Sequence, residues 1–230
     1  MRALPVGEDS LLIDLETPQE AQALHAEVLR RRDAGLLTTR EIVPGEKTVL
    51  LYGVPDAEGL RAELSRWTVP EAAADSGPLL EIPVRYDGAD LSAVARLWGV
   101  REDEVVRVHS GTEHRVAFCG FAPGFAYMTG LPDAYHVPRR DAPRTSVPKG
   151  SVALAGPYTG IYPRSSPGGW QLLGTTQAPL WDMEREPAAL LTPGTRVRFI
   201  PQEPHRELSG KPMSAGTLAS AGRGKRVRCP

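Results

Sequence analysis

The chain has 230 residues, 41% of them hydrophobic and 24% charged, with a formal net charge of −1 at pH 7. This length is enough for one large domain or two small ones. No apolar run approaches the roughly 18 residues of a membrane span, and no basic face is indicated, so the composition argues against a membrane protein and against a nucleic-acid-binding protein.

The ends of the chain and its cysteine content give indications of its cellular location. The N-terminus turns acidic at Glu8 before the apolar core of a signal peptide is reached. Two cysteines, Cys119 and Cys229, are too few for a disulfide framework. Both features predict a cytoplasmic protein. Residues 205–230 hold six Lys or Arg against one acid, among Ser, Gly and Ala, and we expect a flexible basic tail there.

The first third of the chain alternates strand and helix signals. Thr17, Pro18 and Glu20 form the start of a helix with a capping box, and Gly35 ends it. Helices are predicted at 17–35 and 56–67, and strands at 10–15, 40–43, 48–52 and 79–82. The order β-α-β-β-α-β predicts a ferredoxin-like α/β sandwich over residues 1–78, ending in a connector at 70–78.

The second part, residues 79–204, has a different pattern. Asp90 is placed to cap a short helix that ends at Gly99, and residues 102–106 form another helical turn. We expect these helices to pack over a barrel mouth, because the segment lacks the surplus positive charge of a DNA-binding helix-turn-helix. Short strands follow at 115–119, 152–155, 171–174 and 196–200, separated by Gly and Pro turns. The fold class is therefore α+β, with a β-barrel as the second domain.

The block from Gly120 to Gly174 is rich in proline and glycine but also in aromatic residues, which a disordered linker lacks. We interpret it as rigid loops that present a binding surface. Its positive side chains are Arg139, Arg140, Arg144, Lys149 and Arg164. Because a guanidinium matches a carboxylate or phosphoryl group through two hydrogen bonds, an anionic small molecule is the expected ligand. The alternative is that single arginines pair with acids such as Asp133 or Asp141.

Several catalytic patterns are missing from the sequence. Lys149, Gly150 and Ser151 have neither the order nor the upstream glycine of a phosphate-binding P-loop. No Gly-x-Ser-x-Gly motif occurs, and the five histidines lack zinc-like spacing. We therefore predict no metal in this chain and leave open whether it is catalytic alone.

Four motifs occur in order within the block: Gly-Phe-Ala-Pro-Gly-Phe-Ala-Tyr at 120–127, Pro-Arg-Arg-x-x-Pro-Arg-Thr-x-Val-Pro-x-Gly-Ser-Val at 138–152, Gly-Ile-Tyr-Pro at 160–163 and Ser-Pro-Gly-Gly-Trp-Gln at 166–171. Together they resemble the 5-oxoprolinase B-subunit family, also called allophanate hydrolase subunit 1 and KipI-like. The resemblance extends to about residue 204. Two positions depart from it: Tyr158 stands where many members have Gln, and Thr175 where many have Arg.

The resemblance implies a cyclophilin-like β-barrel and a hydrolase function. It implies a subunit of an ATP-dependent 5-oxoprolinase, a lactam amidohydrolase that opens 5-oxoproline to glutamate, with ATP used by the assembled complex. The implied partner is the larger C-subunit of 5-oxoprolinase, or allophanate hydrolase subunit 2 (KipA-like), in a heterotetramer to which a third subunit is added. The alternatives are an allophanate hydrolase or urea carboxylase-type subunit, and a KipI-like non-catalytic inhibitor of a histidine kinase.

Site residues are expected on this basis. We assign catalytic roles to Arg144, for a carboxylate or phosphoryl group, and to His109, for proton transfer or orientation, although helix capping is the alternative for His109. The substrate-binding candidates are Arg139, Lys149, Ser151, Tyr158, Tyr162, Pro123 and Gly124. Phe125 and Trp170 are interpreted as core residues or as anchors of a seam with the partner subunit.

Overall fold

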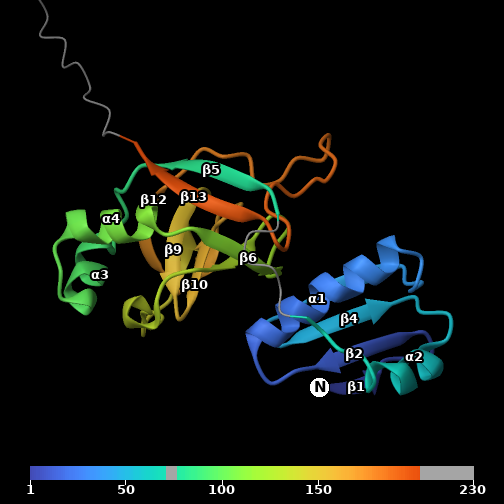
Figure 1. The fold of residues 1–230 in the computed structure, drawn as a ribbon. Helices are drawn as coiled ribbons and strands as arrows, with labels where there is room; N and C mark the ends of the chain where they lie inside the picture. The colour runs from blue at the N-terminus through green and yellow to red at the C-terminus, as the bar shows by residue number, and fades with distance from the viewer. Residues whose placement is uncertain (71–76, 203–230) are drawn as a thin grey trace, which may run out of the picture.

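The computed structural model describes residues 1–70 and 77–202, which form two β-sheet bodies (Figure 1). The first is a four-stranded antiparallel sheet in the order β1-β2-β4-β3. Its elements are β1 (Arg2–Pro5), β2 (Ser10–Asp14), α1 (Pro18–Asp33), β3 (Glu41–Pro44), β4 (Thr48–Tyr52) and α2 (Ala57–Leu64). Alternate residues of β2 and β4 are buried against both helices, so a single core lies between the sheet and the helices.

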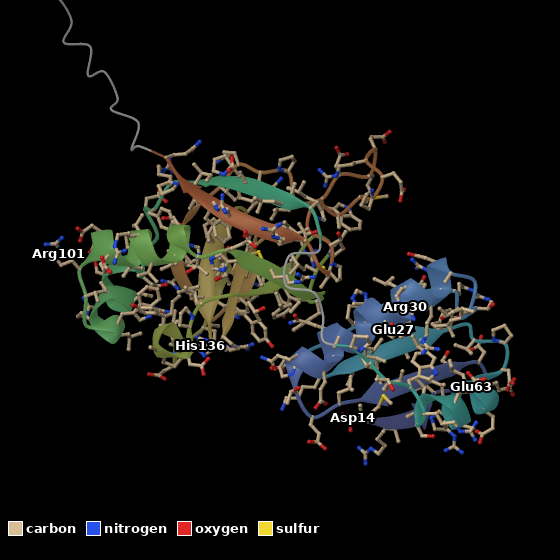
Figure 2. The ribbon with its side chains drawn as sticks, viewed as in Figure 1. Asp14, Glu27, Arg30, Glu63, Arg101 and His136 are labelled. Atoms are coloured by element: carbon tan, nitrogen blue, oxygen red, sulfur yellow. The ribbon has the colours of Figure 1, made fainter. Side chains whose placement is uncertain are left out.

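The helix α1 begins where the sequence predicts. The Thr17 Oγ1 atom accepts a hydrogen bond from the Glu20 backbone N–H at 3.2 Å, which satisfies one of the free donors of the first turn. Within the helix, Glu27 Oε1 lies 2.7 Å from Arg30 Nη2 (Figure 2). The same oxygen lies 2.6 Å from Arg31 Nε. These pairs compensate for the burial of the Glu27 side chain on the core side of α1.

The ferredoxin-like arrangement is not confirmed. The strand predicted at 79–82 is β5 (Leu79–Val84), and it pairs in parallel with β13 (Arg196–Pro201) in the second sheet. The outer position beside β2 is occupied instead by β1, a strand that the sequence pattern did not predict. The N-terminal sheet is therefore complete without the final strand of the expected β-α-β-β-α-β order.

The second body is a seven-stranded sheet in the order β12-β9-β10-β7-β6-β13-β5. The remaining strands are β6 (His114–Cys119), β7 (Ala126–Thr129), β9 (Ser151–Ala155), β10 (Tyr158–Ile161) and β12 (Gln171–Thr175). Beyond the end of β5, Arg85 and Thr175 exchange two backbone hydrogen bonds of 2.9 and 2.8 Å. This bridge joins the two edge strands, so the sheet closes almost completely into a barrel.

Two helices lie against the barrel, α3 (Leu91–Trp98) and α4 (Glu102–Gly111), beside β12 and β13 respectively. Gly99 ends α3 in the left-handed conformation with φ of 68°. The helix α4 extends beyond the predicted turn at 102–106 because Val105 and His109 both face the barrel. The buried residues Val94, Val105, Leu154 and Leu173 form the core beneath the two helices.

The block from Gly120 to Gly174 is more regular than expected. It contains β7, β9, β10 and β12, a short helix η1 (Asp133–Tyr135), and the strands β8 (Arg144–Val147) and β11 (Ser166–Gly168). The last two pair with each other in a separate two-stranded sheet. The interpretation of this block as loops is therefore corrected: much of it is barrel wall. Residues 71–76 of the connector predicted at 70–78, and the whole tail predicted at 205–230, lie outside the described residues.

Candidate functional site

A buried carboxylate joins two arginines of the block. Asp90, which is 3% exposed, accepts hydrogen bonds at Oδ1 from Arg140 Nη1 at 2.7 Å and from Arg144 Nη2 at 2.8 Å. Its second oxygen accepts from the Leu172 backbone N–H at 2.8 Å. We call Asp90, Arg140 and Arg144 the Asp90 cluster. Asp90 precedes α3 but makes no side-chain capping bond to it, so the predicted cap is wrong.

The charges explain why Asp90 stays ionised in this position. Burial alone raises the pKa of Asp90, but the hydrogen bonds from Arg144 and from the Leu172 N–H, with the charges of Arg144 and Arg140, lower it below the ordinary value. Two guanidinium groups and one carboxylate leave the cluster with one surplus positive charge.

Donors of the Asp90 cluster remain without a partner. Arg140 Nε and Arg144 Nη1 are buried and make no hydrogen bond within the described residues. The same holds for Oε1 of Gln171, whose Nε2 donates to the Pro138 carbonyl at 3.2 Å. Buried polar atoms without a partner are costly, and unpartnered guanidinium donors of this kind fit an anion.

Tyrosines lie close to the positive side chains. Burial raises the pKa of Tyr162, while the charges of Arg139 and Arg144 oppose the rise. Burial also raises the pKa of Tyr127, and there too the charge of Arg139 opposes it. Arg139 is exposed, and the neighbouring Arg140 is held by a backbone bond from its N–H to the Gly169 carbonyl at 2.7 Å. The structure therefore brings the predicted Arg139, Arg144 and Tyr162 into one region.

The aromatic residues of the block pack together in a buried cluster. Phe125 is 2% exposed and Trp170 5%, and their ring centroids are 5.4 Å apart. Gly160 makes room for them: a Cβ atom at this position would lie 2.8 Å from a ring carbon of each. Phe125 and Trp170 are core residues, which corrects the alternative that they anchor a partner seam.

His109 is fully buried between α4 and the barrel. Its Nδ1 lies 2.8 Å from the Tyr86 hydroxyl, its Nε2 lies 3.4 Å from Thr159 Oγ1, and its ring stacks on Phe199. Burial, with a contribution from His114, lowers its pKa well below the ordinary value, so the ring is neutral. Both ring nitrogens of this fully buried side chain face side chains of the same chain, Tyr86 and Thr159.

The other predicted site residues lie apart from the Asp90 cluster. Ser151 is buried, and its hydroxyl donates to the Pro148 carbonyl at 2.8 Å, within its own turn. Lys149 and Pro123 are exposed, and Gly124 is buried in the left-handed region with φ of 84°. Among the hydrogen bonds and ion pairs of the described residues, none joins these four to the arginines.

Comparisons with known proteins agree with the motifs. A family model described as "Carboxyltransferase domain, subdomain C and D" matches residues 1–191. The B-subunit of 5-oxoprolinase from Escherichia coli O157:H7 is 42% identical over 211 residues, which cover 88% of this chain and 96% of the relative. That of Haemophilus influenzae is 35% identical over 207 residues, covering 87% and 97%.

The chain belongs to the 5-oxoprolinase B-subunit family. The resemblance predicted from the four motifs is thereby confirmed. A solved structure of TTHA0988 is 35% identical with a TM-score of 0.68, and the match covers 85% of this chain but only 40% of that one. This chain thus spans less than half of TTHA0988. The urea amidolyase of K. lactis, at 18% identity and a TM-score of 0.64, matches 87% of this chain and 15% of its own, which shows a shared fold.

Both positions that depart from the pattern of the 5-oxoprolinase B-subunit family make specific contacts. The Tyr158 hydroxyl donates to Glu46 Oε1 at 3.0 Å, a bond between the barrel and the β3–β4 turn. Thr175 Oγ1 donates to Asp87 Oδ1 at 3.0 Å, beside the ion pair of Arg85 with the same carboxylate. In this family member Tyr158 therefore links the barrel to the β3–β4 turn, and Thr175 links the end of β12 to Asp87.

Sequence reasoning missed three members of the site. Asp90 was interpreted as a helix cap, Arg140 was counted as positive charge without a role, and Gln171 was noted only inside a motif. The available signal was the closeness of Arg140 and Arg144 in the sequence, since two arginines that pack together need a counter-charge.

Two further findings concern the described part of this family member. Within residues 1–70 and 77–202, no group of three or more His, Cys, Asp or Glu side chains is placed to hold a metal ion. In the same ranges, no helix combines the length and the apolar character that a membrane crossing requires.

Proposed function

We propose that this chain is a subunit of an ATP-dependent 5-oxoprolinase that opens 5-oxoproline to glutamate together with the larger C-subunit of that enzyme. Membership of the family, with relatives named as 5-oxoprolinase B-subunits, supports the assignment. The structural observation that supports a role in substrate binding is the Asp90 cluster, with its surplus positive charge and its two unused guanidinium donors. The substrate carries a carboxylate, which such donors bind in pairs.

The proposed reaction requires a site that binds anions. An unstrained lactam resists hydrolysis, and transfer of a phosphoryl group from ATP to its oxygen supplies a leaving group. The substrate therefore carries a carboxylate throughout and a phosphoryl group during the reaction. In this proposal Arg144 and Arg140 bind one of these anions, Arg139 lies at the exposed edge, and Tyr162 forms a wall. ATP is used by the assembled complex.

The remaining predicted residues have lesser roles in this proposal. His109 orients Tyr86 and Thr159 from within the barrel, while Lys149 and Ser151 support the turn that precedes β9. The division into domains at residue 78, the cyclophilin-like character of the barrel, a heterotetramer with the larger C-subunit, and a cytoplasmic location belong to the same proposal. Tyr158, Pro123 and Gly124 are predicted from the sequence to bind substrate, but in this proposal Tyr158 links the barrel to the β3–β4 turn and the other two lie apart from the Asp90 cluster.

Reconstitution tests the assignment. This chain is mixed with the other two purified 5-oxoprolinase subunits, and glutamate release from 5-oxoproline is measured with and without ATP. We expect turnover that needs both ATP and this chain. Release of glutamate without this chain, or none with all subunits present, contradicts the proposed function. Assays of the same mixture with allophanate and urea separate the related amidohydrolase or carboxylase alternative.

Substitution of the arginines tests the site. Arg144→Ala should lower kcat/KM by about 10- to 100-fold, because a hydrogen bond to a charged group is lost. Arg144→Lys keeps the charge but not the two-pronged geometry, and we expect only partial recovery. Arg164→Ala, an exposed arginine of the same block, is the matched control and should retain full activity. A complex that assembles with Arg144→Ala and remains fully active shows that the arginines are structural.

A further inference from the structure

Two loops of the barrel expose large apolar side chains to solvent. The first, at residues 120–125, holds Phe121, which is 60% exposed. Phe121 has φ of 68° and is the one non-glycine residue with positive φ among the described residues. Backbone bonds from Ala122 N–H to the Gly120 carbonyl and from Phe125 N–H to the Ala122 carbonyl fix the turn. A strained conformation that keeps a phenyl ring in water indicates a function outside the folding of this chain.

The second loop, residues 179–190, is built around one arginine. Arg185 donates to the carbonyls of Pro179 at 3.1 Å, Pro187 at 3.2 Å and Ala188 at 2.7 Å. Trp181 and Met183 project from this frame, 42% and 78% exposed. The loop is therefore ordered by its own hydrogen bonds, although its apolar side chains do not contribute to a core.

The two loops touch each other. A Cβ atom added to Gly124 would lie 3.1 Å from the Leu180 carbonyl oxygen and 3.1 Å from Trp181 Cβ, so the first loop packs directly on the second. Phe121 in turn contacts the interior rings, with its centroid 5.3 Å from Phe125 and 6.4 Å from Tyr162. We call Phe121, Trp181 and Met183 the apolar ridge. Through Tyr162, the ridge adjoins the region of the Asp90 cluster.

The composition of the ridge points to a protein partner. Aromatic and methionine side chains are enriched in the centres of protein interfaces, and a rigid loop loses little entropy on binding. The ridge is flanked by the exposed acids Asp182, Glu184 and Glu186. An acidic rim repels an anionic membrane, and a second copy of this chain at the same surface would bring two sets of acids together. A complementary partner has an apolar pocket rimmed with Lys and Arg.

We propose that the apolar ridge is the surface on which the larger C-subunit of 5-oxoprolinase docks, through an apolar pocket with a basic rim. This inference rests on the proposed function. The relatives of this chain are named as subunits, and TTHA0988 continues for more than half its length outside the region matched here, which is consistent with a larger neighbouring polypeptide. Docking at the ridge places this larger partner against Phe121, whose ring contacts Tyr162 of the candidate site.

Binding measurements with the purified larger partner test the docking surface. The double variant Trp181→Ala/Met183→Ala should weaken binding about tenfold or more by isothermal titration, because exposed anchors of this kind carry most of an interface's affinity. Glu184→Lys should also weaken it, with a smaller effect at about 300 mM than at about 50 mM NaCl. Leu36→Ala and Leu97→Ala remove equally exposed apolar side chains elsewhere and should bind within about twofold of the unsubstituted chain.

The outcomes separate the two proposals. If the larger partner binds the double variant as tightly as the unsubstituted chain, with an unchanged Tm, the ridge is not the docking surface, while the proposed function stands. If the unsubstituted chain shows no binding to this partner, the proposed function fails and this inference with it. If the double variant loses self-association instead, the ridge is a surface between copies of this chain and the assignment to the larger partner is overturned.

Discussion

Arg144 Nη2 lies 2.8 Å from Asp90 Oδ1, so a strand of the block is tied to the start of α3 across 54 positions of sequence. Because Arg140 Nη1 binds the same oxygen at 2.7 Å, one buried carboxylate balances two arginines. The position of both guanidinium groups therefore depends on Asp90, which acts on the candidate site as a positioning residue.

Asp90→Asn should destabilise the protein by about 1.5–3 kcal/mol, because it removes the charge that two half-buried guanidinium groups share through hydrogen bonds. Urea unfolding followed by far-ultraviolet circular dichroism gives the free energy. Asp87→Asn is the control, since it removes a carboxylate that pairs with Arg85 at the surface, and it should cost less than about 1 kcal/mol. Equal losses for the two variants would contradict a special role for Asp90.

Gly160 tests the packing of the aromatic cluster. Gly160→Ala places a methyl group 2.8 Å from ring carbons of Phe125 and Trp170, and we expect a loss of about 1–3 kcal/mol from overpacking. Gly111→Ala, where a Cβ meets nothing within 4 Å, is the matched control and should be neutral or slightly stabilising. Guanidinium unfolding followed by tryptophan fluorescence measures both. An unchanged midpoint for Gly160→Ala means that the rings move aside freely.

Local chemistry allowed much of the fold to be predicted. The bond from Glu20 N–H to Thr17 Oγ1 depends only on residues three positions apart, which is why α1 could be placed from its cap. The sheet to which β5 belongs depends on Arg196–Pro201, more than a hundred positions away, and nothing in the alternation of Leu79–Val84 specifies that partner. The ferredoxin-like prediction failed at this non-local step.

The candidate site was predictable in part for the same reason. Arg144 was recognised because positive charge stands out in an aromatic, proline-rich block. Asp90 occupies the position of a helix cap, and a capping aspartate looks identical in sequence to one that pairs with Arg140 about fifty positions later. Burial of the carboxylate decided between the two roles: Asp90 is 3% exposed, and a buried carboxylate is stabilised more by two guanidinium groups than by the N-terminus of α3.

Tyr158 joins the two sheet bodies through Glu46. Tyr158→Phe removes the 3.0 Å hydrogen bond to Glu46 Oε1 and should cost about 1 kcal/mol while leaving the ring contacts with Phe118 and Tyr127 in place. A double-mutant cycle with Glu46→Ala isolates the pair, and we expect a coupling energy of about 0.5–1.5 kcal/mol. Additive effects of the two substitutions would show that the contact does not link the bodies energetically.

The buried His114 predicts a loss of stability in mild acid. Burial lowers its pKa from 6.5 to about 4. In the unfolded chain the ring binds a proton below about pH 6.5, whereas the folded protein excludes it, so the free energy of unfolding is highest above pH 6.5 and falls by about 1.4 kcal/mol per pH unit toward pH 4. His109, with its pKa lowered in the same direction, adds to the fall. Urea unfolding between about pH 7.5 and pH 5 measures the slope. His114→Gln should lower the slope by about 1.4 kcal/mol per pH unit, the value for one proton. An unchanged slope in this variant would mean that His114 takes up its proton in the folded state.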